Sequence, residues 1–182
     1  MSNQLLERLR AGNSRYLEGR TEADVSAGAR RETAEHGQHP NAIVIACSDS
    51  RVIPEAIFDA GIGELFIIRV AGNVLDRHQL GSIEYAAAHL HCPLILVLGH
   101  TGCGAVGAAL SGGGDGFIRY ITDEILLAAG EERDPDKACR LNVLHAVGVI
   151  RHEFKEHPEI PAPGLEVRGA VYDIRSGEVE WL

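Results

Sequence analysis

The chain has 182 residues, of which 45% are hydrophobic and 24% are charged, and its formal net charge at pH 7 is −9. This length and composition predict one folded domain over residues 1–182 and exclude a disordered chain. The negative charge and the lack of a basic run argue against a nucleic-acid partner. No apolar run reaches the roughly 18 residues that would predict a membrane span.

The N-terminus and the cysteines indicate the expected compartment. The first residues, MSNQLLERLRAG, mix acidic and basic side chains without an apolar core, so they do not resemble a secretory signal. A cytoplasmic location is the default expectation. There the four cysteines are expected to be reduced thiols, which in suitable patterns more often bind metal or catalyse than form disulfides.

The N-terminal part of the chain predicts a helix followed by a polar connection. Residues 4–19 carry Leu5, Leu6 and Leu9 on one side, as in an amphipathic helix. Residues 20–38 are polar and predict helix fragments and loop. An amphipathic helix on a polar tether favours a segment that docks on a neighbouring subunit.

The middle of the chain predicts a parallel sheet. Residues 42–47, 64–72 and 93–100 are apolar runs of the kind found in strands that are covered on both faces. Residues 81–91 show helical spacing between the last two runs. Strands that alternate with helices predict an α/β fold with a mostly parallel central sheet flanked by helices. In such sheets ligands lie outside the carboxyl ends of the strands.

The C-terminal part predicts helices and a final hairpin. A glycine-rich loop at 111–116 precedes predicted helices at 117–130 and 136–155, and residues 165–182 alternate around a turn, which predicts a β-hairpin or a last edge strand. The last helix has an apolar stripe that consists of Leu141, Leu144, Val147 and Ile150.

Reactive side chains follow the first predicted strand at every second position. The segment ACSDSRV carries Cys47, Asp49 and Arg51. In an extended chain alternate side chains share one face, so continued strand geometry would make these three groups converge.

A second pair of metal-ligand types ends another predicted strand. The segment LGHTGCGAV carries His100 and Cys103, and Cys103 would begin a helix whose dipole favours the thiolate. Adjacent parallel strands end side by side, so Cys47, His100 and Cys103 can form a Cys₂His set. That set is known for catalytic zinc with a fourth position free.

Two features of the sequence suggest alternatives to a metal site. A single Cys at a strand end is usually a small core residue, and Cys92 and Cys139, which have no patterned partner, are expected to be that. Residues 102–107, GCGAVG, match the dinucleotide fingerprint G-x-G-x-x-G. The fingerprint requires a further strand ending in an acidic residue about 20 residues on, where this chain has a loop and a helix.

The two motifs together closely resemble the β-class carbonic anhydrases, whose signature is C-x-D-x-R with H-x-x-C. The resemblance extends over nearly the whole chain through LLERLRAGNSRYLEG, ELFIIRVAGNVLD, GSIEYAAAHL and VRGAVYDIRSGEVEWL. It implies that Cys47, His100 and Cys103 bind Zn²⁺ and that Asp49 and Arg51 form the family's dyad.

The resemblance also implies a substrate pocket and an assembly. Gln38, Phe66, Tyr85 and Gly104 match positions that line the pocket for CO₂ or bicarbonate in plant-type members. The family forms an obligate dimer with the pocket at the subunit interface, so a homodimer or a dimer-based higher oligomer is expected here.

The fourth zinc ligand could be water or Asp49, since the family shows both arrangements. Members with the closed, bicarbonate-regulated form carry a tryptophan three residues before the first Cys, where this chain has Val44. Arg69 matches another residue of that regulatory pocket, and without the tryptophan it is expected to be structural. A pair between Asp49 and Arg51 would hold the carboxylate away from the metal. The open form with water on zinc is therefore expected.

The implied activity is reversible hydration of CO₂ to bicarbonate and a proton by zinc-bound hydroxide. Two thiolates make the zinc centre formally neutral, which predicts activity that rises on the alkaline side. Hydrolysis of COS or CS₂ at the same site is the alternative. A non-catalytic zinc or nucleotide-sensing module is a third hypothesis, against which the intact Asp49–Arg51 pair argues, because a structural zinc has four protein ligands.

Overall fold

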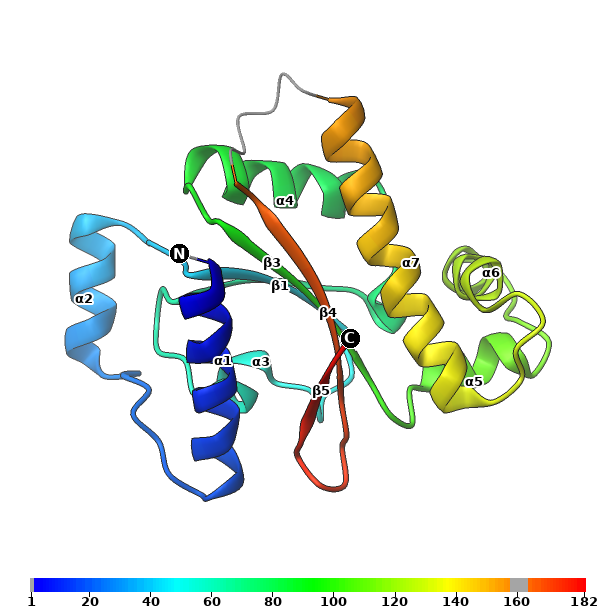
Figure 1. Ribbon diagram of the computed structural model, residues 1–182, viewed down its shortest axis with the longest axis horizontal. Helices are drawn as coiled ribbons and strands as arrows, with labels where there is room; N and C mark the ends of the chain where they lie inside the picture. Colours follow the sequence, from blue (N-terminus) through cyan, green and yellow to red (C-terminus); the bar gives the residue numbers. More distant parts are fainter. Residues whose placement is uncertain (1, 158–163) are drawn as a thin grey trace.

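A five-stranded sheet in the order β2-β1-β3-β4-β5 forms the centre of the computed structural model (Figure 1). The structure describes residues 2–157 and 164–182. The strands are β1 (Ala42–Ala46), β2 (Leu65–Arg69), β3 (Leu94–His100), β4 (Glu166–Tyr172) and β5 (Val179–Trp181). The helices are α1 (Ser2–Leu17), α2 (Ala27–His36), α3 (Pro54–Ile57), α4 (Arg77–His89), α5 (Gly104–Leu110), α6 (Ile118–Ala129), α7 (Pro135–Glu156) and the 3₁₀ turn η1 (Ala71–Asn73).

The sheet is mostly parallel, as the apolar runs predict. β1 pairs in parallel with both β2 and β3, and β3 pairs in parallel with β4. Every residue of β1 and β3 is buried, because both strands are central and covered on two faces. β5 pairs antiparallel with β4, which confirms the predicted C-terminal hairpin.

The alternation along β1 divides the core into two layers. Ile43 and Ile45 belong to the cluster that contains the buried residues of α4, α6 and α7. Val44 belongs to the opposite cluster, with Leu9 of α1 and Phe58 after α3. Helix α1 therefore packs on a face of its own sheet, and its docking on a neighbouring subunit stays a prediction.

Helix α7 buries a different stripe from the predicted one. Val147 and Ile150 are buried, whereas Leu141 and Leu144 are 37% and 50% exposed, so the predicted stripe is wrong at its first two positions. The buried positions of the first half of the helix are Ala138, Cys139, Asn142 and Val143. This face of the helix packs against the sheet because the strand residues opposite it, Gly99 and Gly169, have no side chains. A Cβ on Gly99 would lie 2.5 Å from a methyl group of Val143.

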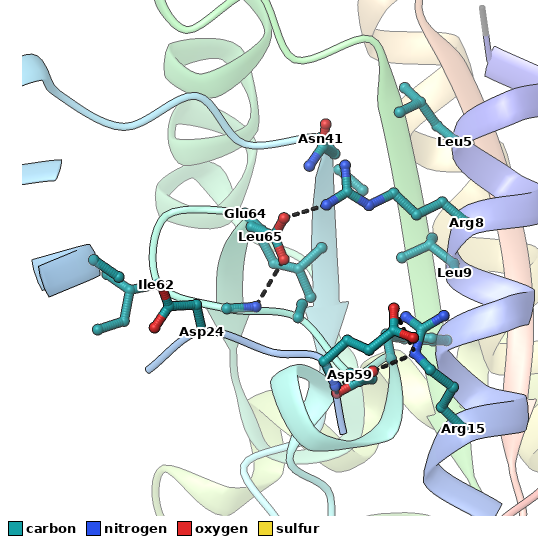
Figure 2. A pocket seen from close by; sticks show the side chains of 16 residues that line it. Leu5, Arg8, Leu9, Arg15, Asp24, Asn41, Asp59, Ile62, Glu64 and Leu65 are labelled. Carbon is teal, nitrogen blue, oxygen red and sulfur yellow. Dashed lines mark hydrogen bonds and ion pairs between the residues drawn. The ribbon is translucent and has the colours of Figure 1, made fainter. Parts of the chain in front are cut away.

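A cavity of about 400 Å³ lies between α1, the segment leading to α2 and the loop before β2 (Figure 2). Four of the charged side chains around it form ion pairs, Arg8 with Glu64 and Arg15 with Asp59. The cavity is lined by Ala42, the first residue of β1, so it lies at the opposite end of this strand from the predicted metal ligands. Within the described residues, none of the helices combines the length and the apolar character needed to cross a bilayer.

Candidate metal centre

Three ligand types meet at the carboxyl ends of two neighbouring strands. Cys47 directly follows β1, His100 is the last residue of β3, and Cys103 is the N-cap residue of α5. One ligand atom from each side chain lies within 4.8 Å of the other two, and all three residues are buried. The parallel pairing of β1 with β3 produces this convergence, because it ends both strands at the same edge of the sheet.

The imidazole of His100 is held with one nitrogen available. Its Nδ1 lies 3.0 Å from the carbonyl oxygen of Thr101, to which the Nδ1–H donates. Its Nε2 is buried and has no hydrogen-bond partner among the described residues. An orphaned buried nitrogen costs roughly 1–3 kcal/mol. A metal ion bound between this nitrogen and the two sulfurs would remove that cost, so the donor set fits the metal that the motifs imply.

The two thiols do not behave alike. Cys47 has its pKa lowered to about 4, first by the hydrogen bond from Cys103, against the effect of burial, and further by His100 and the backbone N–H of Gly72. The pKa of Cys103 is raised, because its proton is shared with the Cys47 sulfur and because it is buried. The proton is therefore held more firmly by Cys103 than by Cys47, and binding of a divalent cation by both sulfurs would release protons.

Asp49 and Arg51 form a two-pronged ion pair beside this cluster. Arg51 donates from Nε to Oδ1 at 2.9 Å and from Nη2 to Oδ2 at 2.7 Å, and the hydrogen bonding with Arg51 holds the pKa of Asp49 far below its ordinary value. Oδ2 of Asp49 lies 3.9 Å from Nε2 of His100. Arg51 also reaches the carbonyl of Gly102 at 3.3 Å, which joins the loops after β1 and β3.

The pair is built by a turn rather than by strand alternation. β1 ends at Ala46, and the N–H of Val52 bonds to the carbonyl of Asp49 at 3.0 Å. The N–H of Arg51 also donates to the Asp49 carboxylate at 3.0 Å, as in an Asx turn. The expectation that residues 47–51 continue as an extended chain is therefore wrong, although the two side chains do meet.

Arg69 braces the first loop. It is the last residue of β2, and it donates from Nε to the carbonyl of Cys47 at 3.0 Å and from Nη2 to the carbonyl of Asp49 at 2.7 Å. These two bonds fix the backbone that carries the first thiol and the carboxylate. They agree with the structural part expected of this arginine.

The predicted pocket residues are not assembled within one chain. Gly104 follows Cys103 and is exposed, with open space where a Cβ would lie. Gln38 precedes β1 and so lies at the far end of this strand from the cluster. Phe66 is opposite Ile43 in the sheet register, near the start of β1, and its ring centroid is 6.2 Å from that of Tyr85.

Three residues beside the cluster were not singled out by the motifs. The N–H of Gly72 bonds to Cys47 Sγ at 3.2 Å, and Asn142 of α7 bonds to the carbonyl of Gly72 at 2.8 Å. Cys139 is buried as expected, but its thiol also donates to the carbonyl of His100 at 3.2 Å, so it does have a specific partner. The one sequence signal for this layer is Asn142, a polar residue within an otherwise apolar stripe of α7.

Known sequences point to the same family as the motifs. The family model described as carbonic anhydrase matches residues 42–179. A carbonic anhydrase of Mycolicibacterium smegmatis is 43% identical over 185 residues, which cover 94% of this chain and 89% of that protein. Carbonic anhydrase 2 of Mycobacterium tuberculosis is 45% identical over 119 residues, 64% of this chain and 58% of that protein, so the match spans less than two thirds of that relative's length.

Solved structures share the fold. A β-carbonic anhydrase of Aspergillus fumigatus superimposes with a TM-score of 0.72 at 28% identity, over 85% of both chains. One of two tetrameric β-carbonic anhydrases of Sordaria macrospora gives a TM-score of 0.71 at 28% identity, over 86% of this chain and 87% of that one. With the family match over most of the sequence, the common fold and the clustered Cys, His and Cys side chains, the chain belongs to the β-class carbonic anhydrase family.

Proposed function

We propose that this protein is a zinc-dependent carbonic anhydrase that reversibly hydrates CO₂ to bicarbonate and a proton. The observation that carries the proposal is the buried cluster of Cys47, His100 and Cys103, whose ligand atoms lie within 4.8 Å of one another beside an arginine-held carboxylate. The Nε2 of His100 has no hydrogen-bond partner among the described residues. The carbonic anhydrases among its relatives support the same activity.

Cys47, His100 and Cys103 would hold the metal. Two thiolates and one imidazole suit zinc better than they suit magnesium or calcium, which prefer oxygen ligands. Three protein ligands leave a fourth position free. Zinc in such a site lowers the pKa of bound water, which supplies a nucleophile for CO₂ near neutral pH.

Asp49 would orient the reacting water. Its carboxylate is ionised and can only accept hydrogen bonds, and the Arg51 guanidinium fixes both of its oxygens. A solvent molecule at the open position would donate a hydrogen bond to Asp49, which would orient its oxygen for attack on CO₂ once one proton has left. The same pairing with Arg51 keeps the carboxylate from becoming the fourth ligand, in agreement with the open form that Val44 favours.

A second copy of the chain would complete the pocket. Phe66 lies in β2, the edge strand of the sheet, and its ring pairs with that of Tyr85 in α4, which is 49% exposed. Together with the exposed Gln38, they would reach the metal centre of a partner subunit rather than their own. The relatives from Sordaria macrospora are described as tetrameric, which supports a dimer-based assembly here.

The decisive experiment measures zinc per chain and times CO₂ hydration by stopped flow, beside COS and CS₂ hydrolysis, from pH 6 to 9. We expect one zinc per chain and CO₂ hydration that rises on the alkaline side. A zinc-loaded protein that hydrolyses COS or CS₂ and barely hydrates CO₂ would favour the hydrolase alternative. A zinc-loaded protein without either activity would overturn the proposal.

A further inference from the structure

The sulfur of Cys47 accepts a hydrogen bond from a backbone group held in an unusual conformation. Gly72, in the η1 turn, donates its N–H to this sulfur at 3.2 Å and has φ +68° and ψ 13°. A Cβ at this position would lie 2.8 Å from Cδ1 of Ile125 and 3.1 Å from Cβ of Ala105. The N–H can approach the sulfur in this way because glycine tolerates both the left-handed backbone and the close packing.

The carbonyl group of Gly72 is held by the side chain of Asn142. Asn142 Nδ2 donates to the carbonyl oxygen of Gly72 at 2.8 Å, from the middle of α7, and Asn142 is only 3% exposed. Burying an amide within an apolar helix face is unfavourable unless it is hydrogen-bonded, so this bond accounts for a polar residue at this position. The N–H of Gly72 thus points at the sulfur while its carbonyl is tied to α7.

We infer that Asn142 is a positioning residue that holds the Gly72 N–H on the Cys47 sulfur and thereby tunes the metal centre. The inference rests on the proposed function, because it concerns the same metal site. A hydrogen bond to a ligating thiolate withdraws electron density from the sulfur, so the sulfur donates less charge to the metal. In a site with two thiolates this preserves the metal's ability to acidify water. Without Asn142, the glycine can leave its left-handed conformation and the N–H can turn away.

The test uses the full-length protein loaded with Co²⁺, whose thiolate-to-cobalt absorption band reports the electron density on sulfur. Asn142→Leu keeps the side-chain volume and removes the donor, and Asn142→Ala is the second variant should the first not fold. Val147→Ala is the matched control, because it removes buried volume from the same helix. We expect the thiolate-to-cobalt band to move to lower energy in the Asn142 variants and to stay at its wild-type position in Val147→Ala. With zinc, the pH midpoint of kcat should move upward.

The outcomes separate a tuning role from simple packing. If the Asn142 variants lose as much stability as Val147→Ala but keep the wild-type absorption band and pH midpoint, then the residue is only structural and the inference is wrong. The cobalt spectrum requires metal binding but no turnover. A wild-type protein that binds cobalt through its thiolates and does not hydrate CO₂ would therefore overturn the proposed function while leaving this inference to be decided by the spectrum.

Discussion

His100 shows how one side chain is prepared for a single task. Its Nδ1–H donates to the carbonyl of Thr101, and the Cys139 thiol donates to the backbone carbonyl of His100, so both the ring and the strand end are fixed. The buried Nε2 has no hydrogen-bond partner among the described residues, and the Asp49 carboxylate lies 3.9 Å from it. If the cluster binds a cation as proposed, this ligand would need little rearrangement.

Substituting individual cysteines separates the metal site from the core. Cys47→Ser should abolish zinc binding and CO₂ hydration together, because it removes the sulfur with the lowered pKa from a three-ligand set. Cys92→Ser should leave both intact, since Cys92 is buried and its thiol lies 3.9 Å from the carbonyl of Leu94, outside the ligand cluster. Zinc analysis and stopped-flow assays on both variants check this. Full zinc retention by Cys47→Ser would contradict the assigned ligand set.

Arg51→Ala should free the Asp49 carboxylate, because it removes both hydrogen bonds that hold its two oxygens. The freed carboxylate would be close to the candidate metal ligands, since Oδ2 lies 3.9 Å from His100 Nε2. The carboxylate would then compete for the open metal position, and kcat should fall by about 10²-fold through lost orientation. Zinc content should stay unchanged, because Arg51 is not a ligand.

Arg51→Lys is the informative comparison. Lysine keeps the charge but cannot make two parallel bonds, so substantial loss should persist. Full activity in both variants would argue against this assignment of the dyad.

Among the elements, the contact of α1 with the loop after α3 depends on one buried carboxylate. Burial would raise the pKa of Asp59, but hydrogen bonds from Arg15, Thr21 and the backbone N–H groups of Glu22 and Ala23 outweigh it and hold the pKa well below the ordinary value. The stabilising effect is present above the unfolded pKa of about 4 and is lost as the pH falls towards the folded value. Asp59→Asn should therefore lower the free energy of unfolding by about 2 kcal/mol at pH 7.

Denaturant unfolding of wild type and Asp59→Asn at pH 7, 4 and 3 checks this sign. The difference between them should be largest at pH 7 and shrink below about pH 4, where the unfolded carboxylate is protonated. Glu35→Gln, which removes an exposed carboxylate from α2, should change little at any of these pH values. A difference for Asp59→Asn that grows towards acid would show that this carboxylate does not favour folding as argued.

The elements also show where sequence patterns suffice. Continuous apolar runs located β1 and β3 to within a residue, because strands covered on both faces leave no other pattern. The motifs at the ends of these strands then predicted that Cys47, His100 and Cys103 lie close together, as they do in the structure. The predicted run over 64–72 is too long, because β2 ends at Arg69 and the η1 turn follows. This end was not predictable, since the hydrogen bonds of Arg69 and Gly72 there go to Cys47, more than 20 positions away. The exposure of Leu144 was likewise not predictable from the helical pattern, because the position of glycines in the sheet decides which face of α7 packs against it.

At the scale of the whole molecule, the separation of Gln38, Phe66 and Tyr85 from the metal ligands predicts complementation between defective chains. The Cys47→Ser chain keeps the aromatic pair but lacks the metal site. The Tyr85→Ala chain keeps the metal site but lacks the aromatic pair. If the pocket is shared across a two-fold interface, then half of the dimers in a co-refolded equimolar mixture are mixed, and each has one complete site of two. The mixture should recover about a quarter of wild-type activity. Stopped-flow rates that stay at the sum of the two separate variants would show that Tyr85 serves its own chain or no site.

The position of the candidate ligands also matters for the chain that carries them. Cys47 and Cys103 stand at the ends of adjacent strands but are separated in sequence by β2, α4 and the whole of β3. An ion held by both acts as a cross-link that closes this long loop, in the way that a disulfide would in an oxidising compartment. The reaction chemistry and the cohesion of the central sheet would thus depend on the same atom, and a cell short of that metal would lose both together.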